Sequence, residues 1–176
     1  MLCEGRREDG CGCGRCSFCR GRRNDECRRD GRRDIREGIE DIRRGIAVCC
    51  EGLEDIRRGC RCEGRRDVNR GLRLIEEGRR DIIRGLRDMR CGPDGDALRR
   101  ACEGLRDISA GICRAREGLR DGSGFCLCNR CRRGCECSRR GCECSRRDGE
   151  RDICEGIRLI EEGLRDIEES LGEHIG

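Results

Sequence analysis

A seven-residue repeat, approximately Glu-Gly-Leu/Ile-Arg-Asp-Ile-Arg, runs through most of the chain and constrains its fold more than any other feature. From Ile35 onward, apolar residues or cysteines follow one another at alternating steps of four and three, at Ile35, Ile39, Ile42, Ile46, Cys49, Leu53, Ile56 and Cys60. This is the a/d spacing of a helix that packs along one side, and a β-strand, whose side chains alternate with a period of two, does not produce it. The repeat therefore predicts an all-α fold.

Breaks in the repeat divide the chain into four predicted helices, near residues 32–58, 65–91, 96–121 and 149–174. Residues 59–64 interrupt the register and could be a turn or a bulge in one long helix. Residues 91–96 combine a glycine, a proline and an aspartate, which are typical of a helix end followed by a helix start. We expect a helical bundle or coiled-coil-like fold with two cysteine-rich irregular tracts. The predicted regions are a basic cysteine-rich tract at 1–30, a helical repeat region at 31–121, a second basic cysteine-rich tract at 122–148 and a C-terminal helix at 149–176.

Glycine recurs just before the a position of the repeat. A glycine inside a helix costs about 1 kcal/mol relative to alanine, so that eleven of them cost about 10 kcal/mol. The glycines are either a residue of the ancestral repeat without a role, or a stripe beside the Ile/Leu seam that lets another backbone approach closely. In both cases a single helix of this composition is not stable alone, and packing or cross-linking must offset the loss. These glycines are residues 38, 45, 52, 71, 78, 85, 104, 111, 118, 156 and 163.

Cysteine is the second unusual feature, with 21 residues among 176. Such a content is typical of disulfide scaffolds and of thiolate metal proteins. All 41 basic residues are arginine, and so narrow an alphabet suggests either a gene grown by duplicating a short unit or a simplified design. Charge is uneven: residues 1–33 carry ten Arg against six acids, and residues 126–147 carry seven Arg against two acids. The basic excess therefore coincides with the two cysteine-dense stretches.

Both tracts contain a Cys-x-Cys-x2-Cys spacing, which could bring several thiolates onto one metal ion. Four thiolates suit zinc, and Cu(I) or an iron–sulfur cluster fits the spacings as well. Nearby arginines would compensate the negative charge of such a site. Dense Cys-x-Cys tracts with almost no histidine are similar in composition to metallothioneins, which implies metal binding, although those proteins lack long helices. The candidate ligands are Cys11, Cys13, Cys16, Cys19, Cys126, Cys128, Cys131, Cys135, Cys137, Cys142 and Cys144.

The alternative use of the cysteines is cross-linking between chains. Cys50, Cys102 and Cys154 are spaced 52 residues apart and fall at the e position beside the seam, and Cys3 and Cys27 flank the first tract. The total is odd, which leaves at least one thiol free or bonded to another chain. Cys49 and Cys60 occupy seam positions and are interpreted mainly as small buried hydrophobic residues. Helical bundles lined with thiols resemble copper-storage proteins, but this chain lacks their repeated inward-facing Cys-x3-Cys.

Other function classes find little support in the sequence. No phosphate-binding glycine loop, nucleophile elbow or dinucleotide motif is present, and His174, the only histidine, is expected to be a helix-end residue. We therefore expect no enzymatic activity and no catalytic residue. A nucleic-acid binder built on arginine-rich zinc modules is the third hypothesis, weakened by interleaved acids and by the absence of aromatic stacking residues. No stretch reaches the length of a membrane span or of a signal-peptide core.

These observations favour a structural, self-assembling helical protein, such as a filament, coat or scaffold subunit, whose main partner is itself. In composition the chain is similar to bacterial spore-coat and appendage proteins. A thiolate metal-binding or metal-storage protein on a helical frame is the second hypothesis. The first implies a surface or coat layer with disulfides, and the second implies the cytoplasm with reduced, metal-bound thiols.

Overall fold

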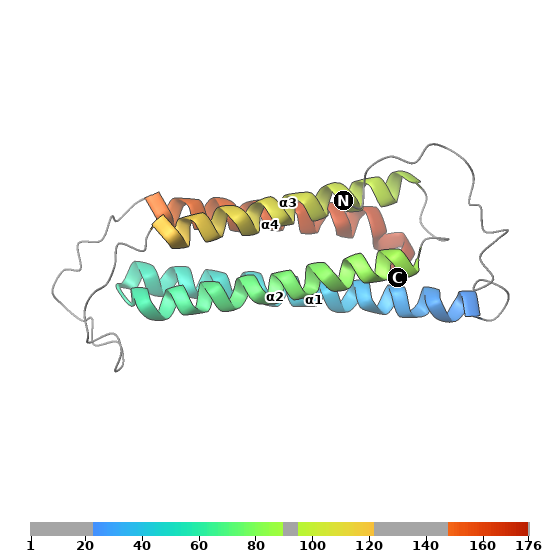
Figure 1. Cartoon of the computed structure of the whole chain (residues 1–176), viewed down its shortest axis with the longest axis horizontal. Helices are drawn as coiled ribbons and strands as arrows, with labels where there is room; N and C mark the ends of the chain where they lie inside the picture. Colours follow the sequence, from blue (N-terminus) through green and yellow to red (C-terminus); the bar gives the residue numbers. More distant parts are fainter. Residues whose placement is uncertain (1–22, 90–94, 122–147, 176) are drawn as a thin grey trace.

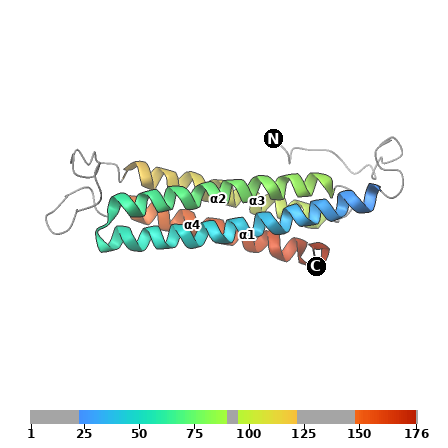
Figure 2. The same ribbon diagram turned by 90° about the horizontal axis from the view of Figure 1, so that it is seen from below.

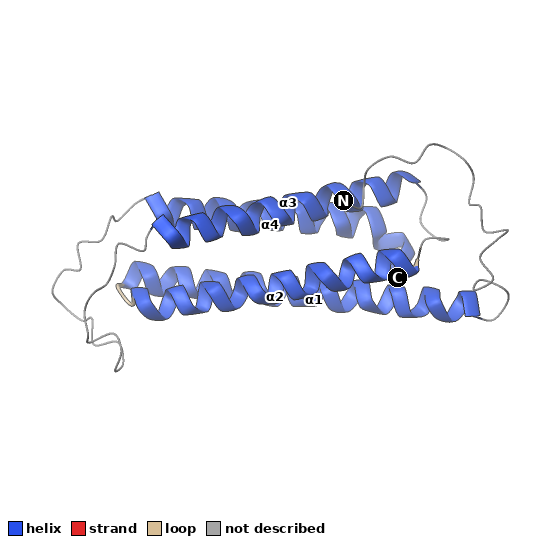
Figure 3. Cartoon of the chain, in the orientation of Figure 1, coloured by secondary structure: helices blue, strands red, loops and turns tan. Residues whose placement is uncertain are grey.

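The structure is a computed structural model that describes residues 23–89, 95–121 and 148–175. In these ranges all regular structure is helical, as Figure 3 shows. The helices are α1 (Arg23–Arg58), α2 (Arg61–Asp88), α3 (Gly95–Asp121) and α4 (Asp148–Ile175). They lie side by side in an elongated four-helix bundle (Figures 1 and 2). The predicted all-α fold and its four helices are confirmed.

Helix α1 and helix α2 are separated by a tight turn, so residues 59–64 do not form a bulge in one long helix. Gly59 has a φ of 98°, the left-handed conformation with which glycine ends helices. The Cys60 N–H donates to the Asp55 carbonyl at 2.8 Å, and the Gly59 N–H donates to the Ile56 carbonyl at 3.1 Å. Together these bonds form a Schellman motif. Because α1 ends before Cys60, that side chain is exposed, and its interpretation as a buried seam residue was wrong.

Helix α1 also begins earlier than predicted, at Arg23 instead of near residue 32. The part of this extension near Gly31 packs on α2, because Gly31 continues the seven-residue spacing of the glycines by one step and lies against Gly85 of α2. Packing on a long partner helix stabilises a polar segment whose own hydrophobic pattern is weak.

The bundle consists of two antiparallel pairs of helices, hairpin 1 (α1 and α2) and hairpin 2 (α3 and α4). In hairpin 1 the glycines of the two helices face one another. A β-carbon on Gly45 would lie 2.7 Å from the Gly71 carbonyl oxygen, and one on Gly71 would lie 2.5 Å from the Gly45 oxygen. Real β-carbons essentially never come so close to another atom, so only glycine fits. The glycine pairs of hairpin 1 are Gly31–Gly85, Gly38–Gly78, Gly45–Gly71 and Gly52–Gly64.

Hairpin 2 is built in the same way. A β-carbon on Gly156 would lie 2.5 Å from the Gly111 carbonyl oxygen. One repeat beyond the Gly104–Gly163 pair, the positions equivalent to the two glycines hold Ala97 in α3 and Ser170 in α4. Both residues are buried. The interpretation of the glycines as a stripe that lets two backbones approach closely is therefore correct. Backbones this close can form Cα–H···O contacts between the helices. The glycine pairs of hairpin 2 are Gly104–Gly163, Gly111–Gly156 and Gly118–Gly149.

The apolar residues divide into two sets according to their distance from the glycines. Residues four positions after a glycine pack between the helices of one hairpin, as Ile42 does beside Gly78. Residues one position after a glycine face the other hairpin: Arg79 of α2 donates to Ser109 of α3 at 3.1 Å. Buried apolar side chains from both hairpins form one continuous core. Across the residues that the structure describes, the core is therefore a narrow seam without aromatic side chains.

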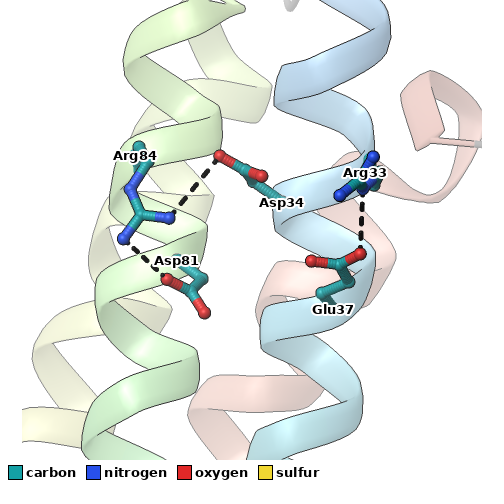
Figure 4. Close-up of polar contacts among 5 residues, drawn as sticks. All are labelled: Arg33, Asp34, Glu37, Asp81 and Arg84. Carbon is teal, nitrogen blue, oxygen red and sulfur yellow. Dashed lines mark hydrogen bonds and ion pairs between the residues drawn. The ribbon is translucent and has the colours of Figure 1, made fainter.

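The outer faces of the hairpins carry charged residues that pair along and between helices. In Figure 4, Arg84 of α2 lies 3.0 Å from Asp81 of its own helix and 4.0 Å from Asp34 of α1, and Arg33 pairs with Glu37 at 2.9 Å. Partial burial raises the pKa of Asp34, and the Arg84 charge opposes this shift. These pairs lie at the surface, where each contributes little stability.

Candidate cross-linking thiols

The position two residues before each glycine lines the edges between the two hairpins, and we call it the edge position. On the α1–α4 edge, Arg43 and Glu168 both occupy it and form an ion pair at 2.9 Å. On the α2–α3 edge, Glu76 and Arg116 occupy it and pair at 2.8 Å. The edge position therefore faces partly toward solvent and partly toward the other hairpin.

Cysteine occupies the edge position once in every helix. Cys50 and Cys154 lie on the α1–α4 edge, between the ion pairs of that edge. Cys154 faces Arg57, whose Nη2 donates to its Sγ at 3.5 Å, while the Arg57 Nε donates to Glu150 at 2.6 Å. The bond to Glu150, followed by the proximity of Cys154, raises the pKa of Arg57. The four edge cysteines are Cys50, Cys62, Cys102 and Cys154.

Cys50 lies opposite Glu161 on this edge. Partial burial and then the charges of Glu161 and Cys154 raise the pKa of its thiol. Cys50 and Cys154 are therefore close, but each faces a different residue of the neighbouring helix. Cys50 is exposed, whereas Cys154 is half-buried and packs against the core.

Cys49 differs from its neighbour because it lies inside hairpin 1. Its side chain is 0% exposed, and its Sγ lies 3.5 Å from the Val68 carbonyl oxygen, to which it donates. Burial, with a smaller contribution from Cys50, raises the pKa of its thiol to about 12. Since the thiolate is the reactive form, burial and the raised pKa both disfavour reaction of Cys49 in the folded protein. Its interpretation as a small buried hydrophobic residue is confirmed.

Two exposed cysteines were not among the cross-link candidates predicted from the sequence. Cys60 is exposed at the turn, and Cys113 is exposed on the outer side of α3. The signal for Cys113 was available in the repeat, because it lies two residues after Gly111 and therefore away from the helix partner. Cys60 could not be placed without knowing where α1 ends.

Most of the described cysteines lie toward one end of the bundle. We call it the turn end, because it carries Gly59 and Cys60, and Figure 1 shows that α3 ends and α4 begins there. The two glycine pairs nearest this end in each hairpin, Gly45–Gly71 and Gly52–Gly64 in one and Gly111–Gly156 and Gly118–Gly149 in the other, are close to these cysteines. Cys102, beside Gly104, lies toward the opposite end, as does Cys27 near the start of α1. The cysteines of the turn half are Cys49, Cys50, Cys60, Cys62, Cys113 and Cys154.

The predicted metal ligands lie outside the described residues: Cys11, Cys13, Cys16, Cys19, Cys126, Cys128, Cys131, Cys135, Cys137, Cys142 and Cys144. The same holds for the predicted cross-link residue Cys3. Cys27 belongs to α1, but its side chain is outside the described part. Across residues 29–89, 95–120 and 149–172, no three His, Cys, Asp or Glu side chains are arranged to hold a metal ion. Zinc, Cu(I) or iron–sulfur binding by the tracts stays a prediction.

Comparison of the chain with protein families, with curated proteins and with solved structures gave no match. In the described helices, none has an apolar stretch long enough to cross a bilayer. What can be said of function therefore depends on the residues and their geometry.

Proposed function

We propose that this protein is a structural subunit that assembles with copies of itself and is cross-linked through cysteines at the surface of its helical bundle. The observation that carries the proposal is the division of the cysteines. Cys49 is buried, whereas Cys50, Cys60 and Cys113 are exposed. The two helices of each hairpin are brought together by glycine pairs and not by these thiols. Thiols that the fold does not need for its core are available to bond other chains.

The glycine–isoleucine seam supports this proposal because hairpin formation already uses it. With the glycine pairs closed inside each hairpin, the seam of a folded subunit is not a free surface. Contacts between copies are then left to the outer faces and to the thiols. Concentration of exposed cysteines in the turn half would make this half the cross-linked one.

Charge gives a second source of attraction between copies. Helix α4 carries three Arg against ten Asp and Glu, a net charge of −7, whereas residues 126–147 carry a net charge of +5. Opposite charges on separate parts of a subunit favour head-to-tail contact, and a head-to-tail contact that does not close into a ring gives a filament. A surface or coat layer with oxidising conditions is the location that fits such a subunit.

The test is intact native mass spectrometry, with a non-reducing gel, on protein isolated without reductant or chelator. We expect covalent multimers, a loss of two mass units for each cysteine pair, and collapse to single chains on reduction. Peptide mapping should find interchain disulfides at Cys50, Cys60 or Cys113 and an unmodified thiol at Cys49. Chains of full mass that carry zinc, copper or iron–sulfur adducts would contradict the proposal and favour metal storage in the tracts.

A matched pair of variants sharpens the test. Replacing Cys50, Cys60 and Cys113 together by serine removes exposed thiols without touching the core, and we expect the longest covalent multimers to be lost. Replacing Cys49 by alanine should leave the multimers unchanged, since its thiol is buried. Equal ladders from the triple variant and the wild type would place the cross-links elsewhere in the chain.

A further inference from the structure

The surface between the two hairpins differs in kind from the surfaces inside them. Within a hairpin, glycine pairs bring the backbones together so closely that a single added methyl group would collide with a carbonyl oxygen. Between the hairpins no glycine pair was found in the described residues, and contact depends on side chains one residue after or two residues before each glycine. The hairpins are therefore tight units with a looser surface between them.

Arginine occupies two core-facing positions of this surface in α2. Arg79 donates to Ser109 of α3, but its Nε has no hydrogen-bond partner among the described residues. Arg65 donates to the carbonyl oxygen of Leu119. The corresponding positions of α2 one repeat away hold Leu72 and Leu86, which are buried. Guanidinium groups at positions otherwise filled by leucine lower the apolar content of the surface and make it easier to hydrate.

Opposite charges select the two hairpins for one another. The helices of hairpin 1 hold 19 Arg and 16 acids, a net charge of +3, whereas those of hairpin 2 hold 9 Arg and 15 acids, a net charge of −6. Arg43–Glu168 at 2.9 Å and Arg57–Glu150 at 2.6 Å carry this attraction across the α1–α4 edge. Hairpin 1 repels a second hairpin 1 and attracts any hairpin 2, whether it belongs to the same chain or to another.

We propose that this surface also joins separate molecules: hairpin 2 of a second copy of the chain docks on hairpin 1 in place of the chain's own hairpin 2. The exchange reproduces every contact of the bundle, and it leaves the glycine pairs of both hairpins closed. It is a low-cost route to dimers because no new surface is required. Open-ended exchange along a row of chains gives a polymer with the same contact. The inference deepens the proposed self-assembly and rests on it, but the contact needs no disulfide.

The test uses two charge-reversed full-length chains in the presence of reductant. The first is Arg43→Glu with Arg57→Glu, and the second is Glu150→Arg with Glu168→Arg. Each chain alone places like charges across its own α1–α4 edge. Mixed and refolded together, they restore opposite charges at all four positions only by exchanging hairpins. We expect native mass spectrometry to show a shift from the 20.0 kDa mass of one chain to a heterodimer of twice that mass.

The control is one chain with all four substitutions, which restores opposite charges within the molecule. It should have the same distribution of masses as the wild type. Mixed single-reversal chains that stay at the mass of one chain would overturn the proposal, as would dimers that form equally well from either reversed chain alone. If the reversed chains fold only when mixed, recovery of helical circular dichroism together with the heterodimer mass supports exchange.

A second measurement decides the question if the reversed chains do not fold even when mixed. Two wild-type chains with different affinity tags are refolded together in reductant, and co-purification is compared with that of chains mixed after refolding. Exchange predicts co-purification only after joint refolding, and its absence in both samples overturns the proposal. Because reductant is present throughout, a negative result here leaves the disulfide ladder of the untreated protein as a separate test of thiol cross-linking.

Discussion

Hairpin 1 and hairpin 2 are two versions of one structure that differ mainly in how their helices are connected. Gly45 of α1 corresponds to Gly111 of α3, 66 residues later, and Gly71 of α2 corresponds to Gly156 of α4, 85 residues later. The difference of 19 residues lies between the glycine pairs nearest the turn end, Gly52–Gly64 in hairpin 1 and Gly118–Gly149 in hairpin 2. Hairpin 1 turns at Gly59 and Cys60, whereas hairpin 2 has residues 122–147 between its helices.

The glycine pairs hold the two helices of each hairpin together, whereas the connection between the helices differs from one hairpin to the other. The glycine pairs are kept in both versions, so they carry the fold. The connection is free to change length, because the helices are already aligned by the glycines on either side of it. The second cysteine tract therefore lies at a position where the hairpin tolerates a longer connection.

The largest expected effect comes from filling one glycine pair in each hairpin. We predict that Gly45→Ala and Gly111→Ala each lower the free energy of unfolding by about 2–3 kcal/mol, because the β-carbon forces the helices apart. The added β-carbon of Gly45→Ala would lie 2.7 Å from the Gly71 carbonyl oxygen, and that of Gly111→Ala would collide with the Gly156 carbonyl oxygen. Chemical denaturation followed by circular dichroism measures the loss.

The matched control is Gly172→Ala, at a helical glycine whose added β-carbon meets no atom within 4 Å. It should gain no more than about 1 kcal/mol from helix propensity. A loss in hairpin 1 without a loss in hairpin 2 would show that the two hairpins are not equivalent. A gain at Gly45 would show that the close approach of the helices is not real.

The second prediction concerns the connection itself. Deleting residues 126–144 and replacing Phe125 by glycine gives hairpin 2 the connection length of hairpin 1. We expect the four helices to form and the free energy of unfolding to rise by about 1 kcal/mol, because a shorter loop costs less entropy to close. Circular dichroism with urea titration in reductant measures it. Loss of the helical signal would mean that the tract is needed for folding.

The third prediction tests Arg79, which has Leu164 at the corresponding position of hairpin 2. We expect Arg79→Leu to raise the free energy of unfolding by about 1 kcal/mol, because a poorly satisfied guanidinium is exchanged for apolar contact with the other hairpin. Ser109 keeps its own bond to the Leu105 carbonyl at 2.8 Å. Arg80→Leu, at an exposed position of the same helix, is the control and should change stability little. A loss at residue 79 would mean that the bond to Ser109 outweighs burial.

The smallest expected effect is electrostatic and concerns Asp34, on the outer face of hairpin 1. The pKa of Asp34 is raised, chiefly by burial, so its folded-state pKa lies above its unfolded value. Such a group stabilises the fold below its unfolded pKa of about 3.9, and this stabilisation is lost as pH rises through the folded-state pKa. We predict that Asp34→Asn gains a few tenths of a kcal/mol at pH 7 relative to pH 3. Urea titrations at the two pH values measure it, and a larger relative loss at pH 7 would show that attraction by Arg84 dominates.

The seven-residue spacing by itself determined the helical fold and the position of each helix to within a few residues, except at the start of α1. Local rules suffice there, because apolar residues at steps of three and four specify a helix whatever it packs against. The glycine positions also indicated close backbone approach. The spacing further indicated that Cys50, Cys102 and Cys154 lie beside the seam, since the heptad position fixes the face of a helix.

Only the tertiary structure decided which helices pair and which cysteines are buried. The seam residues of all four helices are nearly interchangeable in sequence, so the partner of Gly45 could have been any other glycine of the repeat. The antiparallel register selects Gly71 because the Gly59 turn folds α2 back on α1. Cys49 and Cys60 both continue the seam spacing, four residues after Gly45 and one residue after Gly59, and one is buried and the other exposed because α1 ends between them. Burial depends on what lies opposite, and a repeat that is the same everywhere does not specify its own neighbour.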